Sequence, residues 1–349
     1  MSEQGIIRTV TGDIPASSLG WTMIHEHLIC DLSLYWTPED NEQVAGLSAT
    51  TENIRAIRMN PFAVRDNLQL DQIAGTIREL VFYATVGGGT IVEITSHGIG
   101  RDIKALEYIA RASGIQIIAG CGYYIGQGHP RSFDKRSIDD LTNELIEELT
   151  VGINGGPIRA GVIGEIGVGS YPMQLGEHNM LLASVRAQLA TGAGMIIHPA
   201  PGTESAFEIV RVLSEAGASM HKIVISHLDE RFRSDLGLFR RMGQFGVLFG
   251  FDTFGRELYF SPRRRQHPSD TERIETIVRL WDGGLGEKVV LAQDICMRHE
   301  LASLGGQGYS YVLEYIVPRL REQGIPAFAI DQMLCKTPST VLKFTRNHT

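Results

Sequence analysis

The chain has 349 residues, of which 43% are hydrophobic and 21% charged, and its formal net charge is −8 at pH 7. This acidic balance, with no basic stripe beyond the arginines at 263–265, argues against nucleic acid as a partner. Four cysteines without CxxC spacing, a polar start and the lack of an apolar run near about 18 residues argue against a secreted or membrane protein. We therefore expect a soluble cytoplasmic protein whose partner is a small-molecule substrate.

Eight short apolar runs are spaced along the chain, and most are nearly continuous Val, Ile, Leu and Ala with glycine. Such runs are typical of parallel strands that are buried on both faces. They span residues 21–27, 90–95, 115–124, 159–167, 194–199, 222–229, 245–252 and 288–295.

The segments between these runs have helical spacing. In one of them Ile274, Val278 and Trp281 recur on one face, behind a capping box formed by Ser269 and Glu272. Strand and helix alternate eight times, a pattern that predicts an α/β fold of the (β/α)8 TIM barrel type with right-handed crossovers.

We expect one domain over residues 1–349, because no linker, charge block or low-complexity tract divides the chain. Two polar stretches, 33–70 and 255–268, are predicted to be long loops after the first and seventh strands. Loops at these positions of a barrel usually shape the substrate pocket.

Five of the eight runs end in residue types that bind metal ions. His25 and His27 lie two apart, so in a strand both imidazoles face one side while Glu26 faces the other. His198 and His227 end the fifth and sixth runs. Each could be a core histidine satisfied by hydrogen bonds, but unrelated core histidines have no reason to share one end of a barrel. Together they favour a metal site at the barrel mouth.

Two carboxylates complete this set. Glu165 lies among apolar residues and glycine, where an unpaired carboxylate would cost on the order of several kcal/mol, so we expect a metal partner; a buried ion pair with an arginine is the alternative. Asp294 ends the eighth run. Four histidines and two carboxylates exceed one tetrahedral site and suit two divalent ions roughly 3.5–4 Å apart that share a carboxylate. The expected chemistry is hydrolysis, with Asp294 binding one ion and accepting a proton as the catalytic base.

Several segments of the chain resemble the amidohydrolase superfamily and, more closely, its phosphotriesterase-related branch. These segments are TVTG at 9–12, LG at 19–20, HEHL at 25–28, ITSHGIGRD at 94–102, FDTFGR at 251–256, QDIC at 293–296 and GGQGY at 305–309. The resemblance extends from about residue 5 to residue 345, which is essentially the whole chain.

The resemblance implies two divalent metal ions and assigns their ligands. His25, His27 and Asp294 would bind the more buried ion, His198 and His227 the more exposed ion, and Glu165 would bridge the two. Zinc is the expected metal, with manganese, cobalt or iron as alternatives, because such ligands accept all four. The resemblance also favours a homodimer.

The chain departs from its relatives at two positions. Phosphotriesterases and related lactonases usually carry a carbamylated lysine where this chain has Glu165, so this chain resembles a glutamate-bridged branch. Where phosphotriesterases have a histidine and lactonases an arginine, this chain has Thr253, and phosphotriesterase activity is expected to be weak.

Three further residues are candidates for the surroundings of the metals. Tyr124 aligns with a lactonase tyrosine beside the metals and is predicted to bind substrate, with a rim tyrosine as the alternative. Arg256, in the loop after the seventh run, is also predicted to bind substrate. Asp229 could accept a hydrogen bond from an imidazole or relay a proton, or it could cap a helix.

The leading hypothesis is a binuclear metal-dependent hydrolase that opens a lactone or another carboxylic ester by attack of a metal-bridging hydroxide. An amidase acting on a small N-acyl compound is the alternative, because the same nucleophile attacks either carbonyl. A weak phosphotriesterase is a further alternative. The non-enzyme alternative is a small-molecule binding protein on a hydrolase scaffold.

Overall fold

Eight parallel strands form the central sheet of the protein, shown here by a computed structural model that describes residues 5–260 and 265–344. Their order is β14-β11-β10-β9-β8-β7-β6-β3, so sequential strands are neighbours. The strands are β3 Trp21–Glu26, β6 Gly88–Glu93, β7 Gln116–Cys121, β8 Val162–Gly167, β9 Met195–His198, β10 Ile223–Ile225, β11 Leu248–Phe251 and β14 Val289–Leu291. Each falls on one of the eight apolar runs, which confirms the predicted (β/α)8 barrel.

Contacts between β3 and the residues just after β14 close the barrel. The Asp294 backbone N–H donates to the carbonyl of His25 at 3.2 Å. The Glu26 carboxylate accepts the backbone N–H groups of Gln293 and Ile295 at 2.8 and 2.9 Å. These hydrogen bonds fix the backbone on both sides of Asp294.

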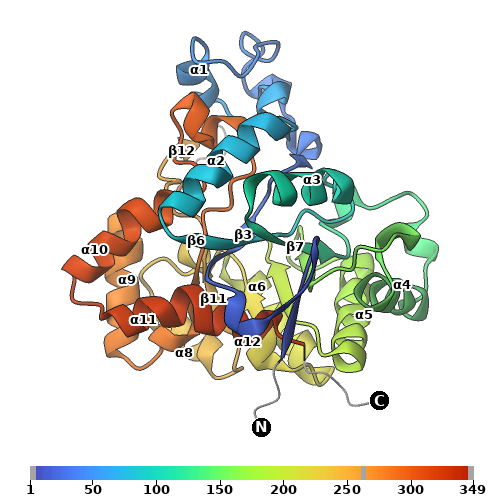
Figure 1. Cartoon of the computed structure of the whole chain (residues 1–349). Helices are drawn as coiled ribbons and strands as arrows, with labels where there is room; N and C mark the ends of the chain where they lie inside the picture. The colour runs from blue at the N-terminus through green and yellow to red at the C-terminus, as the bar shows by residue number, and fades with distance from the viewer. Residues whose placement is uncertain (1–4, 261–264, 345–349) are drawn as a thin grey trace.

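Helices surround the barrel (Figure 1). The helices between the strands are α2 Ile73–Thr85, α3 Ile103–Ser113, α4 Ile138–Thr150, α5 Leu175–Thr191, α6 Thr203–Glu215, α8 Leu236–Gly243 and α9 Asp270–Asp282. Shorter helices are α1 Ile54–Met59, α7 Leu228–Arg231, α10 Val317–Glu322, α11 Ala327–Asp331 and α12 Thr337–Leu342. The predicted capping box opens α9, where the side chains of Ser269 and Glu272 each accept the other's backbone N–H.

The sixth strand is shorter than its apolar run. The run at 222–229 predicts a strand through Asp229, but β10 ends at Ile225. His227 has a φ of 58°, and the chain enters α7 at Leu228, so Asp229 belongs to a helical turn. An apolar run therefore located this strand but could not show where the backbone turns out of the sheet.

The segment 33–70 lies over one end of the barrel, at the top of Figure 1. It was predicted to be a loop, and it contains α1 and three short 3-10 turns. The two-stranded ladder of β4 Cys30–Asp31 and β5 Gln69–Leu70 ties its two ends together. This ladder makes the segment a compact cover rather than an open loop.

The predicted loop at 255–268 contains a short antiparallel ladder of β12 Tyr259–Phe260 and β13 Arg265–Gln266. Two of its three consecutive arginines lie at 263 and 264, outside the described residues. A further hairpin, β1 Ile6–Thr9 and β2 Gly12–Pro15, packs near the start of β7 through a 2.9 Å bond from Val10 N–H to the Ile117 carbonyl. This hairpin therefore lies by the amino ends of the strands, opposite the predicted ligands.

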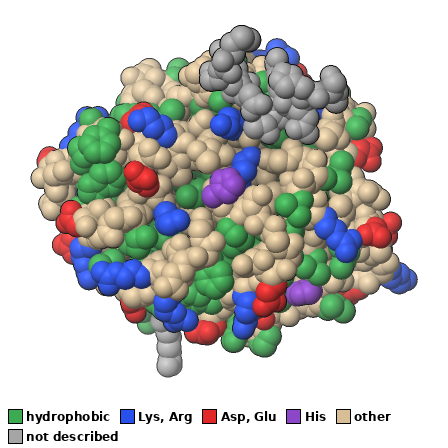
Figure 2. Space-filling model, turned by 90° about the horizontal axis from the view of Figure 1, so that it is seen from below, with side chains coloured by type: hydrophobic (Ala, Val, Ile, Leu, Met, Phe, Trp, Pro, Cys, Tyr) green, Lys and Arg blue, Asp and Glu red, His purple; other side chains and the backbone are tan. Residues whose placement is uncertain are grey.

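Basic and acidic side chains are interspersed on the face seen from below in Figure 2. All four cysteines are free thiols. Within residues 5–260 and 265–344, no helix is long and apolar enough to cross a membrane.

Candidate metal centre

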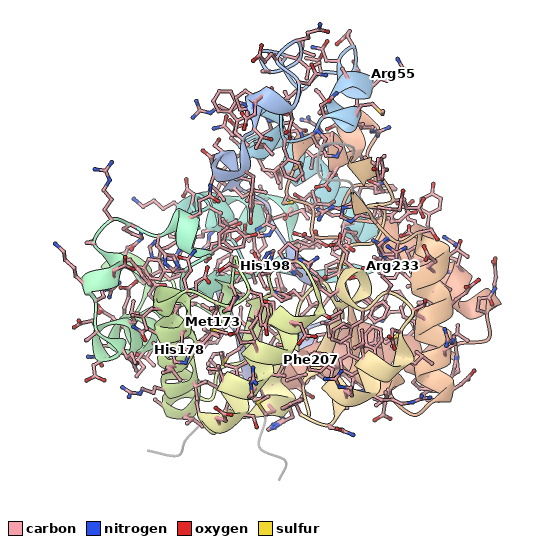
Figure 3. All side chains as sticks on the ribbon, turned by 180° about the vertical axis from the view of Figure 1, so that it is seen from behind. Arg55, Met173, His178, His198, Phe207 and Arg233 are labelled. Atoms are coloured by element: carbon pink, nitrogen blue, oxygen red, sulfur yellow. The ribbon has the colours of Figure 1, made fainter. Side chains whose placement is uncertain are left out.

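The structure brings all six predicted metal ligands together at the carboxyl ends of the strands. His25 lies in β3 with His27 just beyond it, Glu165 lies in β8, His198 ends β9, His227 follows β10 and Asp294 follows β14. Figure 3 shows His198 near the middle of the molecule, whereas His178 lies on the outer helix α5. The convergence arises because parallel strands direct all their carboxyl ends to one face of the barrel.

Glu165 lies at the centre of this group and is only 2% exposed. Its Oε1 atom is 3.0 Å from Nδ1 of His198 and 3.4 Å from Nε2 of His25. The same oxygen is 3.7 Å from Nε2 of His227, and Oε2 is 3.9 Å from Nε2 of His27. Its carboxylate is therefore surrounded by imidazoles rather than paired with an arginine, in the position that a bridging ligand would need.

The donor atoms fit divalent metal ions. The Nε2 atom of His25 is buried and has no hydrogen-bond partner, although oxygens of Glu165 and Asp294 each lie 3.4 Å away. A buried polar atom without a partner costs free energy, and a metal ion at this position would satisfy it. Imidazole nitrogens with carboxylate oxygens suit zinc, manganese, cobalt or iron. The residues present could thus hold the two ions implied by the resemblance.

Hydrogen bonds on the far side of three imidazoles orient them toward this centre. Asp252 contacts Nδ1 of His25 at 2.8 Å and Nδ1 of His227 at 2.9 Å. The Thr95 hydroxyl contacts Nδ1 of His27 at 2.9 Å. Because each Nδ1 is occupied, the Nε2 atoms are left for metal binding.

The charges of the centre depend on one another. Burial lowers the pKa of His25, but Glu165, Asp294 and Asp252 outweigh burial and raise this pKa to about 9. Burial raises the pKa of Glu165, but the neighbouring imidazoles, led by His25, hold it well below its usual range. A metal ion that binds His25 must therefore displace a proton near neutral pH.

Asp294 is held as an anion by a neighbouring cation. Burial raises the pKa of Asp294, but Arg256 and then His25 hold it far below its usual range. The Nη1 atom of Arg256 donates to Oδ2 of Asp294 at 2.9 Å, and its Nε donates to Glu300 at 2.9 Å. Arg256 lines the cavity, where substrate contact was predicted, and the structure adds this contact with Asp294.

Two of the predicted ligands have strained backbones. His227 has a φ of 58° and Asp294 a φ of 53°, which is the left-handed region that favours glycine. Such a conformation costs on the order of 1–3 kcal/mol at a residue other than glycine and is concentrated at functional sites. The strain is consistent with placement of these two side chains for function.

A cavity of about 260 Å³ opens onto the centre, and His27, Glu165, His198, His227 and Asp294 reach it. Its apolar lining residues are Leu32, Tyr35, Phe62, Ile99, Ile125 and Met297. Tyr124 also lines the cavity, where its hydroxyl accepts a 3.0 Å hydrogen bond from Tyr35. The ring of Tyr124 lies 5.1 Å from that of His198, so this tyrosine borders the centre, as predicted.

Asp229 does not hold an imidazole. Its Oδ2 atom instead accepts hydrogen bonds from the Thr253 hydroxyl at 2.5 Å and from Arg273 at 2.8 Å. Asp252 has the imidazole contacts, and the sequence analysis missed it. The available signal is its position, because Asp252 is the last residue of the seventh run and Asp294 lies at the end of the eighth.

A sequence profile of the Phosphotriesterase family matches residues 5–342. The chain belongs to this family. It is 36% identical over 349 residues to the N-acetyltaurine hydrolase of Bos taurus, covering 98% of this chain and 99% of that protein. With the N-acetyltaurine hydrolase of Salmo salar it shares 38% identity over 345 residues, covering 97% and 98%.

A solved structure shares the fold of this chain over nearly its whole length. A resiniferatoxin-binding protein from Rhodobacter sphaeroides superimposes with a TM-score of 0.92 at 33% identity, covering 97% of this chain and 95% of that one. The phosphotriesterase family membership confirms the resemblance found in the sequence and places the chain among hydrolases. Its assignment to a glutamate-bridged branch of the phosphotriesterase family stays a prediction.

Proposed function

We propose that this protein is a metal-dependent hydrolase that cleaves the amide bond of a small N-acyl compound. The observation that supports this is full-length similarity, at 36–38% identity, to relatives named N-acetyltaurine hydrolase. N-acetyltaurine is an N-acyl amide. The sequence motifs alone favoured an ester or lactone, and these relatives favour the amide alternative instead.

The proposal places the two ions between His25, His27, Glu165, His198, His227 and Asp294. When bound, such a pair of ions supplies an activated water and polarises the carbonyl oxygen of the substrate. Glu165 would contribute negative charge to both positions, since its oxygens face imidazoles of both sets.

Asp294 would move the proton that amide cleavage requires. Its Oδ2 is held by Arg256 at 2.9 Å, while its Oδ1 faces the centre, 3.4 Å from Nε2 of both His25 and His27. Oδ1 can accept the proton from the attacking water and pass it to the leaving nitrogen as the C–N bond breaks. This transfer matters for an amide because an unprotonated amine nitrogen leaves poorly. The products are a carboxylic acid and an amine.

The walls of the cavity suit the two halves of such a substrate. The apolar lining residues can pack against the hydrocarbon part of the acyl group, and Tyr124 lies beside His198. The same cavity is lined by Arg231 and Arg256, each paired with a carboxylate. The substrate is therefore expected to place its acyl group against the apolar lining residues and its amine portion near the two arginines.

A matched panel tests the amide proposal. We expect metal-loaded protein to hydrolyse at least one of N-acetyltaurine and short N-acyl amino acids with a kcat/KM of about 10⁴ M⁻¹ s⁻¹ or more. Lactones with acyl parts of similar size should be poorer substrates. The Asp294→Asn variant, purified in the same way, is the control for contaminating amidases. Rapid lactone opening without measurable amide cleavage would return the assignment to an ester hydrolase.

A further inference from the structure

We propose that Asp252 is a positioning residue that sets the tautomer of one imidazole in each of the two metal subsites. The proposal rests on the metal centre of the proposed function, but not on the amide substrate. It assigns a role to a carboxylate that is fully buried and belongs to neither predicted ligand set.

The contacts of Asp252 connect distant parts of the barrel. Asp252 follows β11, and its Oδ2 lies 2.8 Å from Nδ1 of His25 in β3. Its Oδ1 lies 2.9 Å from Nδ1 of His227 after β10 and also accepts the His227 backbone N–H at 2.7 Å. Because β3 and β10 are not neighbours in the sheet, this carboxylate joins the two subsites from behind.

The chemistry of a carboxylate restricts both imidazoles. An ionised carboxylate accepts hydrogen bonds and cannot donate them, so each Nδ1 that contacts Asp252 must carry a proton. A neutral imidazole has only one N–H, and its other nitrogen must then carry a free lone pair. In both rings that nitrogen is Nε2, which lies 3.4 Å from Oε1 of Glu165 in His25 and 3.7 Å from the same oxygen in His227.

Replacement by asparagine should affect the two rings unequally. An asparagine with its oxygen in the Oδ1 position still accepts both N–H groups of His227 and directs its NH₂ group at Nδ1 of His25. The asparagine NH₂ group and a protonated Nδ1 of His25 cannot both donate in one contact. Nδ1 of His25 must therefore accept the hydrogen bond, and the ring must carry its proton on Nε2. A protonated Nε2 cannot bind a metal ion, and the subsite of His25 should fail first.

The experiment measures metal content and affinity in the full chain. After equilibration at a buffered free zinc concentration that just fills both subsites of the parent, we expect Asp252→Asn to hold about one ion per chain where the parent holds about two, with the Kd of the lost ion raised roughly 10–100-fold. The matched control is Ser226→Ala. The Ser226 hydroxyl also contacts Nδ1 of His25, but it is uncharged and its distance of 3.2 Å is longer than that of Asp252. This control should keep both ions.

The tautomers themselves provide a second readout. In the zinc-loaded parent, long-range ¹H–¹⁵N spectra should show His25 and His227 protonated at Nδ1, and in Asp252→Asn the His25 proton should move to Nε2. If the variant does not fold, the parent spectra still decide, because protons on Nε2 would overturn the proposal. Parental Kd values for both ions in a folded Asp252→Asn variant, or a parent that binds fewer than two ions, would also overturn it. A parent with two ions that cleaves no amide contradicts only the substrate proposal.

Discussion

Replacing Asp294 with asparagine is expected to lower kcat by about two to four orders of magnitude, the usual contribution of a positioned general base. An asparagine side chain can still accept the Arg256 N–H through its oxygen, so the fold should remain. Much of the bound metal should also remain, because the other five predicted ligands are unchanged. It cannot take the proton from the attacking water. Because this proton transfer occurs only as the substrate reacts, kcat and kcat/KM should fall together.

Steady-state kinetics with an N-acyl substrate and metal analysis of the same preparation check this prediction. The metal analysis is essential, because a variant that lost an ion would be inactive for a different reason. An Asp294→Asn variant with two ions per chain and near-parental kcat would show that the proton leaves by another path.

Replacing Glu165 with glutamine is expected to remove at least one metal ion and to lower kcat/KM by about 100-fold or more. The carboxylate is 2% exposed and faces imidazoles of both subsites, so no other group in its place can supply the missing negative charge. A neutral amide is a poor bridge between two cations. Because Glu165 is itself anionic, the activity of the parent should also be indifferent to added bicarbonate, unlike that of a carbamylated lysine centre.

The matched control for this prediction is Glu177→Gln. Glu177 is likewise buried, but its carboxylate accepts backbone N–H groups of Gly126, Gly169 and Gln174 near the start of α5. This variant should keep both ions even if its unfolding temperature falls. Retention of two ions with parental affinity in Glu165→Gln would instead give Glu165 a structural role.

The barrel and the convergence of the six ligands could be predicted because both depend on local patterns. A strand buried on both faces must be apolar along its length, and a polar residue at its carboxyl end must lie at the mouth of the barrel. His25 and His27 add a spacing of two, which fixes a shared face within one strand. No long-range pairing had to be known for these inferences.

The hydrogen bonds behind the ligands could not be predicted in the same way. Asp229 and Asp252 each end an apolar run, so their positions in the sequence are equivalent. Only the three-dimensional structure shows that Asp252 contacts His25 across the barrel and that Asp229 instead contacts Arg273. The contact of Arg256 with Asp294 likewise joins loops after different strands. Substrate choice depends on such loops, which is why the motifs alone did not separate an amide from an ester.

The central claim is that two metal ions at this centre drive amide hydrolysis, and a titration of the metal-free protein tests it most directly. Zinc or manganese is added in measured equivalents, and bound metal and N-acyl amide hydrolysis are followed in the same samples. We predict that activity is absent without metal, rises with added metal and reaches its plateau at two equivalents per chain. Full activity in the metal-free protein, or a plateau of bound metal and activity at one equivalent, would contradict the account.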